Sequence, residues 1–119
     1  MNHRFSVTLP LTGEYLTTVR LTTGGICALA GFDVDSSEDF KVCVTESLLI
    51  LKRNGYLTAT VDFIVEEALK CSVQGKEMGG MVEDTMEEEI SHALLFALVG
   101  EVEFDRNEQG GVSGIRFEG

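Results

Sequence analysis

One helical stripe limits what this chain can fold into more than any other feature of its sequence. Near the middle of the chain, apolar and small side chains recur three and four positions apart, which is the spacing of one buried helix face. These residues are Phe40, Cys43, Val44, Ser47, Leu48 and Leu51. Ser36 or Ser37 can cap the start of the helix, and Asn54 and Gly55 can end it. The stripe therefore predicts an amphipathic helix over residues 36–53.

The patterns before and after this helix predict an α+β fold. Alternating apolar and polar residues predict strands, and apolar residues at helical spacing predict helices. Strands are expected at 4–9, 56–65, 68–74, 101–106 and 112–117, and further helices at 13–30 and 84–99. Residues 75–82, which are rich in glycine and methionine, are expected to form a loop. The order β-α-α-β-β-α-β-β is typical of a two-layer α/β sandwich with its helices on one face of the sheet.

Each of the other two helices is also expected to bury one face. In the first helix these residues are Tyr15, Leu16, Val19, Ile26 and Ala30. In the last helix they are Ile90, Ala93, Leu94, Ala97 and Leu98. In the central helix, Val42 and Leu49 lie on the side opposite the stripe, so that helix is expected to be covered on two sides.

Length and charge narrow the classes of function. The chain has 119 residues, of which 44% are hydrophobic and 24% charged, so one globular domain over residues 1–119 is expected. Twenty acidic residues against nine basic ones give a net charge of −11. Nucleic acids and anionic membrane surfaces attract lysine and arginine, so neither is an expected partner. A basic protein surface suits this charge better.

The start of the chain and its cysteines favour a cytoplasmic protein. The N-terminal residues lack the apolar segment of a signal peptide, and no apolar run approaches the ~20 residues that cross a bilayer. The three cysteines, Cys27, Cys43 and Cys71, form no CxxC pair, and an odd number does not suit a closed set of disulfides. They are expected to be reduced thiols in the core.

Several general site motifs are incomplete. An EF-hand beginning at Asp33 lacks the glycine at its sixth position and has Val44 where the terminal glutamate belongs. Residues 75–80 place a lysine among glycines but lack the GK[ST] ending of a phosphate-binding loop. His3 and His92 are far apart and have no partner at metal-ligand spacing, so no metal site is expected.

One resemblance extends over nearly the whole chain. The matching segments are Glu14-Tyr15-Leu16, Arg20-Leu21-Thr22, Gly25-Ile26, Gly31-Phe32, Glu38-Asp39-Phe40-Lys41-Val42, Val44-Thr45-Glu46-Ser47, residues 99–104 and residues 110–112. With them the chain resembles the anti-sigma-factor serine-protein kinases, bacterial regulators of transcription within the histidine-kinase-like (GHKL) ATPases. The resemblance implies one domain of the Bergerat fold, with a mixed, mostly antiparallel sheet. In that family the cofactor is Mg-ATP.

The family holds Mg-ATP with three short motifs, and the first is only half present. It combines a glutamate that acts as general base with an asparagine, four residues later, that ligates magnesium. Glu46 matches the glutamate, but Ile50 stands at the asparagine position. Residues i and i+4 share a helix face, so an apolar side chain replaces an oxygen that Mg²⁺ requires. Glu46 is then the vestige of a general base.

The second and third motifs are also altered. In the second, Gly75 takes the position of an aspartate that hydrogen-bonds adenine, and Glu77 takes that of the following glycine. The third places two glycines at the start of the last helix, where bare backbone amides bind phosphate. Glu89 and Ser91 take these positions, after two further glutamates at 87–88. This acidic run would repel a triphosphate, although it also complements the helix dipole.

The resemblance therefore implies a degenerate member: a regulatory protein-binding module without bound cofactor, metal or catalytic residues. Family partners are a sigma factor and an anti-sigma antagonist, and the family domains form homodimers. Arg20 matches the family arginine of the R-L-T motif and could contact such a partner, or it could be an ordinary exposed arginine. Val42 and Leu49 could form an apolar interface or could pack beneath what remains of the nucleotide lid.

Two other functions remain open from the sequence. One is an active ATP-dependent serine kinase that uses Glu46 with unusual ligands for the metal and the adenine. The other is a small-molecule sensor that has reused the pocket. A nucleotide-binding measurement distinguishes the first of these from the protein-binding module.

Overall fold

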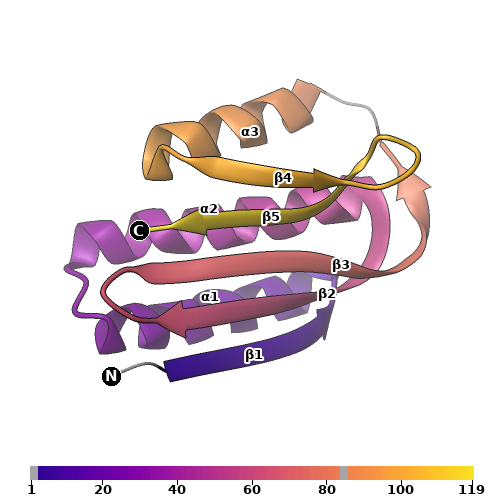
Figure 1. Cartoon of the computed structure of the whole chain (residues 1–119). Helices are drawn as coiled ribbons and strands as arrows, with labels where there is room; N and C mark the ends of the chain where they lie inside the picture. Colours follow the sequence, from indigo (N-terminus) through magenta and orange to yellow (C-terminus); the bar gives the residue numbers. More distant parts are fainter. Residues whose placement is uncertain (1–2, 84–85) are drawn as a thin grey trace.

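The computed structural model describes residues 3–83 and 86–119, and these residues form three helices and five strands in the predicted order (Figure 1). The elements are β1 (His3–Pro10), α1 (Gly13–Leu29), α2 (Val34–Arg53), β2 (Asn54–Val65), β3 (Leu69–Val82), α3 (Met86–Val99), β4 (Val102–Arg106) and β5 (Val112–Glu118). The α+β class is confirmed. Apart from the end of β3, the ends of the described elements lie within two positions of the predicted ones, as is usual for element ends. Residues 84–85 of the predicted last helix lie outside the described residues.

The strands form one sheet in the order β1-β2-β3-β5-β4. Within the described residues every pairing is antiparallel, so the mixed, mostly antiparallel sheet of the family expectation is wrong in this detail. The chain direction explains the result. The chain turns back between β1 and α1, between α1 and α2, and between α2 and β2, so β1 and β2 run in opposite directions (Figure 1). Hairpins join β2 to β3 and β4 to β5.

The core lies between the sheet and α2. Figure 1 shows α1 and α2 side by side on one face of the sheet, while the other face is open. The stripe predicted for the central helix is confirmed, because all six of its residues are buried. Ala59, Val61 and Phe63 from alternate positions of β2 belong to the same core cluster. Burial of the stripe against these strand residues contributes apolar stabilisation to the fold.

The buried face of α1 differs in part from the prediction. Val19 and Ile26 are buried as expected, but Tyr15 is 45% exposed. Thr23 and Cys27 are buried instead. The Thr23 hydroxyl donates to the carbonyl oxygen of Val19 at 2.7 Å, and this bond allows a polar side chain to lie in the core.

The predicted buried face of α3 is correct only in part: Leu94 and Leu98 are half-buried, but the other three residues face outward. Ile90 is 57% exposed, and Ala93 and Ala97 are exposed as well. The residues that turn inward and are buried are Ser91 and Leu95. The first half of the inner face is polar, so apolar periodicity alone assigns part of this face wrongly.

The predicted loop at residues 75–82 is also wrong. β3 continues to Val82 and pairs with a β2 that begins at Asn54, although the register shifts between the pairs near this end. Gly79 has φ +141°, and a Cβ there would lie 3.1 Å from the side chain of Leu57. A glycine is therefore needed where β3 passes over Leu57. The segment that would form a nucleotide lid is part of the sheet.

The three cysteines are free and buried, as the sequence predicts. Burial raises the pKa of the Cys43 thiol to about 12, and the carboxylates of Asp39 and Glu46 add to this effect. Thiolate is the reactive form, so Cys43 is held in its unreactive state. Among residues 3–83 and 86–119, no helix combines the length and hydropathy that a membrane crossing needs.

Asp33, rather than Ser36 or Ser37, caps α2. Its carboxylate accepts a hydrogen bond of 2.8 Å from the backbone N–H of Ser36. This bond lowers the pKa of Asp33 below its ordinary value of 3.8. The charged cap also complements the positive end of the helix dipole.

We expect Asp33→Ala to lower the melting temperature at neutral pH, because it removes this cap. The folded-state pKa is depressed, so the stabilisation is complete above the unfolded-state value and is lost as the pH falls through the folded-state pKa. Thermal melts from neutral to acid pH measure the difference. Asp33→Asn is the control, since it keeps an acceptor but cannot titrate. A deficit of the alanine variant that persists unchanged in strong acid would contradict a charge-assisted cap.

Candidate functional site

The positions of the family's nucleotide motifs divide into two groups in the structure. Glu46 and Ile50 lie one turn apart on α2, and Ser91 of α3 contacts Glu46 directly. Gly75 lies on β3 opposite Ala59, and Glu77 is exposed farther along the same strand. Glu89 is exposed on the first turns of α3. The fold thus brings the general-base position to the position of a phosphate-binding glycine.

Ser91 is the centre of a polar cluster between α2 and α3. Its hydroxyl donates to Oε2 of Glu46 at 2.6 Å and accepts from Nη2 of Arg53, also at 2.6 Å. Nε of Arg53 donates to Oε2 of Glu88 at 2.9 Å. Ser91 and Arg53 are buried, so these bonds are shielded from competition with water. We call Glu46, Arg53, Glu88, Ser91 and His92 the α2–α3 clamp.

His92 extends the α2–α3 clamp towards β4. Its Nε2 lies 3.0 Å from Oε1 of Glu88. The imidazole stacks on the ring of Phe104, with the ring centroids 4.5 Å apart and the planes inclined by 10°. His92 therefore links α3 to β4, and the sequence offers it no metal-ligand role.

Asn54, the residue that ends α2, connects the same region to β5. Its Nδ2 donates to the carbonyl oxygen of Ile50 at 2.8 Å, and its Oδ1 accepts from the backbone N–H of Val112 at 3.1 Å. A residue expected only to terminate a helix thus also holds the end of α2 to the sheet. No local sequence pattern predicts the bond to Val112, because that residue lies 58 positions later in the chain.

The α2–α3 clamp engages the group that would act as base. Oε2 of Glu46 already accepts the Ser91 proton, and Ser91 in turn is held by Arg53. A general base must reach the proton of a bound substrate at hydrogen-bond distance. In the structure this carboxylate is instead hydrogen-bonded to a side chain of the protein itself.

Ile50 is fully buried. It lies in the same core cluster as Leu48 and Leu51, and it presents no oxygen to a metal ion. Across the residues that the structure describes, no group of three or more His, Cys, Asp or Glu side chains is arranged to hold a metal. The position that would ligate magnesium contributes to the apolar core.

Gly75 is covered by the ring of Tyr56. A Cβ at Gly75 would come within 3 Å of three atoms of that ring, so no larger residue fits while the ring stays in place. The hydroxyl of Tyr56 accepts a hydrogen bond of 3.2 Å from Nδ2 of Asn107. An aspartate at position 75 would clash with the Tyr56 ring, and the hydrogen bond from Asn107 to the ring hydroxyl holds that ring in place. A glycine on one strand with an aromatic residue on the adjacent strand is a known sequence combination, and it is the signal in the sequence that could have indicated this packing.

A groove of about 360 Å³ lies at the end of the sheet where α1 begins and α2 ends. Its lining residues are Leu11, Thr12, Leu49, Lys52, Arg53, Tyr56, Leu57, Gly80, Met81, Glu83 and Glu87. Leu49 lies here with Gly80 and Met81 from the segment predicted as a lid. Leu49 is half-buried and lines an open groove, so both alternatives for it, packing beside this segment and forming an apolar interface, agree with its position.

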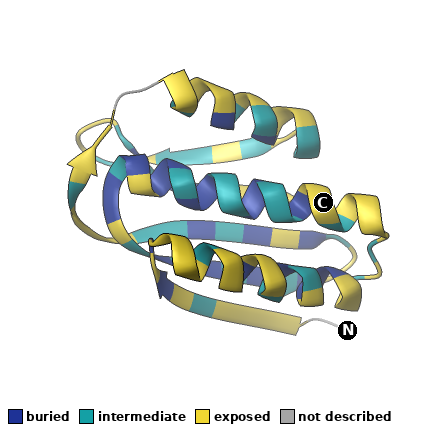
Figure 2. Ribbon diagram, turned by 180° about the vertical axis from the view of Figure 1, so that it is seen from behind, coloured by how far each residue is buried: buried dark blue, intermediate teal, exposed yellow. Residues whose placement is uncertain are grey.

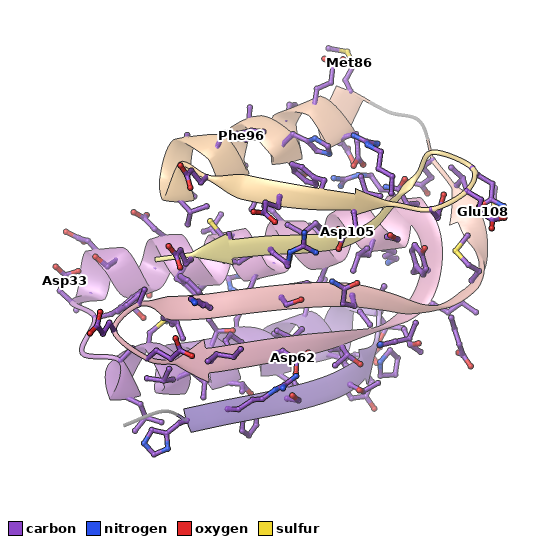
Figure 3. The ribbon with its side chains drawn as sticks, in the orientation of Figure 1. Asp33, Asp62, Met86, Phe96, Asp105 and Glu108 are labelled. Atoms are coloured by element: carbon purple, nitrogen blue, oxygen red, sulfur yellow. The ribbon has the colours of Figure 1, made fainter. Side chains whose placement is uncertain are left out.

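A separate depression of about 350 Å³ lies on the open face of the sheet. Asp62, Lys70 and Arg116 are among its lining residues, and Arg116 is paired with the carboxylates of Glu103 and Asp105. Figure 3 shows Asp62 and Asp105 on this face, on the side away from α2. It contains none of the nucleotide-motif positions.

Arg20 lies exposed on α1 and makes no ion pair with any described residue. The same helix exposes Leu21 and Leu29. Both interpretations of Arg20, a partner contact and an ordinary exposed arginine, agree with this position. The contact stays a prediction.

Comparison with known proteins reveals similarity in structure rather than in sequence. No protein-family model matches the chain, and no curated protein sequence matches it. Among solved structures, the crystal structure of the RsbU and RsbW domains of Rv1364c from Mycobacterium tuberculosis superimposes with a TM-score of 0.69 over 98% of this chain, at 18% sequence identity. The match covers 32% of that longer chain. The similarity shows that the chain shares its α+β fold with part of that protein.

Proposed function

We propose that the chain is an anti-sigma-factor-like regulatory module that binds proteins and has lost ATP binding and kinase activity. The sequence resemblance to anti-sigma-factor kinases and the fold shared with a structure that contains an RsbW domain support the regulatory role. Its partner is then a sigma factor or an anti-sigma antagonist, met in the bacterial cytoplasm, and Arg20 is a candidate contact. Homodimer formation belongs to the same proposal.

The hydrogen bond from Ser91 to Glu46 is the observation that most directly supports the proposed loss of nucleotide binding. It joins the position of a phosphate-binding glycine to that of the general base, and it closes the space between them. Two further observations support the proposal, the burial of Ile50 and the packing of Tyr56 on Gly75. ATP would have to displace the α2–α3 clamp and the Tyr56 ring before it could bind.

We expect Mg-ATP and Mg-ADP to leave the melting temperature unchanged. A ligand at 100 times its Kd would add about 2.7 kcal/mol of stability. For a domain of this size that corresponds to a shift on the order of 10 °C. Differential scanning fluorimetry with a nucleotide titration, with and without magnesium, measures the shift.

A saturable, magnesium-dependent shift would contradict the loss of binding and favour the active kinase. Transfer of labelled phosphate from ATP to a serine of an antagonist protein would do the same. Co-elution of the chain with purified sigma factors and antagonists tests the protein-binding half separately.

A further inference from the structure

The end of the β2–β3 hairpin nearest α3 exposes large apolar side chains. Met81 is 83% exposed, and Val82, Met78 and Leu57 are exposed as well. Figure 2 shows the last part of β3 as an exposed segment. Isolated apolar side chains on a surface are ordinary, but several at one place mark an interaction site.

Two backbone hydrogen bonds hold the walls of the adjoining groove together. The N–H of Leu11 donates to the carbonyl oxygen of Leu57 at 2.8 Å, and the N–H of Glu83 donates to that of Arg53 at 2.7 Å. The first bond sets Leu11 beside Leu57, and the second joins the end of β3 to the end of α2. The groove is therefore a formed feature of about 360 Å³ rather than a gap between loose segments.

The floor of this groove is apolar, with Leu11, Leu49, Leu57 and Met81 from four different elements or their connections. Gly80 lies among them and adds no side chain, so the floor stays open. Methionine is flexible and polarizable, and it adapts to partners of different shape. Leu11 is nearly buried, so the surface that an apolar ridge can contact comes from Leu57, Met81 and the half-buried Leu49.

Two carboxylates, those of Glu83 and Glu87, line the groove. Both side chains are exposed, and neither pairs with a basic side chain within the described part of the chain.

Two cations also line the groove, but they do not balance this charge. Arg53 is neutralised by Glu88, which leaves Lys52 as the cation without a carboxylate partner among the described lining residues. The chain as a whole carries a net charge of −11. A partner segment with positive charge is therefore complementary to this surface.

We propose that this groove is the docking site for an amphipathic helix of a partner protein that carries lysine or arginine along both edges of its apolar face. Apolar residues three and four positions apart would fill the floor, and the basic residues would meet the acidic rim. The inference deepens the proposed function, and it rests on that proposal only for the premise that the chain binds proteins.

A helix suits the site better than an added strand. β3 pairs with β5 only through Lys70 to Gln74, so its later residues have a free edge. That part of β3 contains register shifts against β2 and the positive φ of Gly79. An added strand needs a regular row of backbone donors and acceptors, which this irregular edge does not offer.

The test uses a designed amphipathic peptide of leucine and lysine, about 15 residues long, titrated into the full chain. Fluorescence anisotropy measures affinity, and ¹⁵N NMR spectra locate the binding surface. A peptide of the same composition with its apolar stripe scrambled controls for charge alone. A peptide with glutamate in place of lysine controls for the apolar face alone. We expect the first peptide to bind most tightly, with shifts confined to residues around the groove.

Two variants and a matched control test the assigned residues. Met81→Ser is expected to weaken binding about tenfold, as for a central apolar contact. The double variant Glu83→Gln, Glu87→Gln is expected to weaken binding and to reduce its dependence on salt. Leu21→Ser, at a side chain that is 75% exposed on α1, is expected to leave binding unchanged. All these positions are exposed, so thermal melts should show that the variants remain folded.

Several results would overturn the proposal. These are equal binding of the scrambled peptide, NMR shifts centred on α1 or on the open face of the sheet, an unchanged affinity of the Met81 variant, and a bound peptide in extended rather than helical conformation. Failure of the peptide to bind would also overturn it. The nucleotide titration reports on the proposed function independently, so the two can fail separately.

Discussion

Replacing Ile50 by asparagine, the residue that the kinase family has at this position, is expected to destabilise the fold rather than to restore a magnesium site. Ile50 is completely buried in the core cluster. The change loses roughly 2 kcal/mol of apolar burial and leaves a buried amide without partners, at a cost of about 2 kcal/mol more. The sum, about 4 kcal/mol, corresponds to a fall in melting temperature on the order of 15 °C.

Urea denaturation and thermal melts measure this effect, and two conservative variants separate its causes. Ile50→Leu keeps the volume and is expected to cost less than about 1.5 kcal/mol. Ile50→Val removes one methylene and is expected to cost about 1 kcal/mol. If Ile50→Asn were as stable as the valine variant, the position would have room and hydrogen-bond partners for an amide. A magnesium-dependent gain in stability would show that the cleft is closed by this residue alone.

Replacing Arg53 by alanine is expected to release α3 from α2. The guanidinium holds both Glu88 and Ser91, and the side chain is only 9% exposed. Without it, the carboxylates of Glu46 and Glu88 remain near each other with no cation between them. Breaking a largely buried ion pair by removing one partner costs about 3 kcal/mol or more. We expect a loss of that size in urea denaturation and faster amide hydrogen exchange along α3 than along α2.

Lys52→Ala is the matched control, because Lys52 is the neighbouring residue on α2, its side chain is exposed, and it forms no ion pair with a described residue. It is expected to change stability by less than about 0.5 kcal/mol. Arg53→Lys keeps the charge but cannot form the same forked contacts, so its stability should fall between those of the wild type and Arg53→Ala. Equal stability of Arg53→Ala and Lys52→Ala would mean that apolar packing, not the α2–α3 clamp, holds α3.

Both predictions bear on the proposed loss of nucleotide binding. By the resemblance, Ser91 and Ile50 stand where the kinase family holds phosphate and metal; in the structure Ser91 is hydrogen-bonded to Glu46 of α2, and Ile50 lies in the apolar core. The groove beside α2 is a separate feature, lined in part by Gly80 and Met81 of the segment expected to form a loop. The proposed protein-binding role uses that groove.

Local patterns were sufficient to predict the element order and the buried face of α2. Phe40, Cys43 and Leu48 repeat at helical spacing over several turns, and only one orientation of the helix buries them all. The same reasoning failed for α3, where Ile90 lies outward and Ser91 inward. The polar inner face becomes stable only when Glu46 and Arg53 are present, and they lie 45 and 38 positions earlier in the sequence.

The sequence by itself determined the order of helices and strands and the buried stripe of α2, since each of these depends on side chains that lie close together along the chain. Only the tertiary structure decided that the lid segment is a strand, that Tyr56 covers Gly75 and that Ser91 joins Glu46 to Arg53. The physical reason is that the burial of a polar group or a bare glycine depends on partners from distant segments. Those partners meet only when the sheet and α2 have packed together.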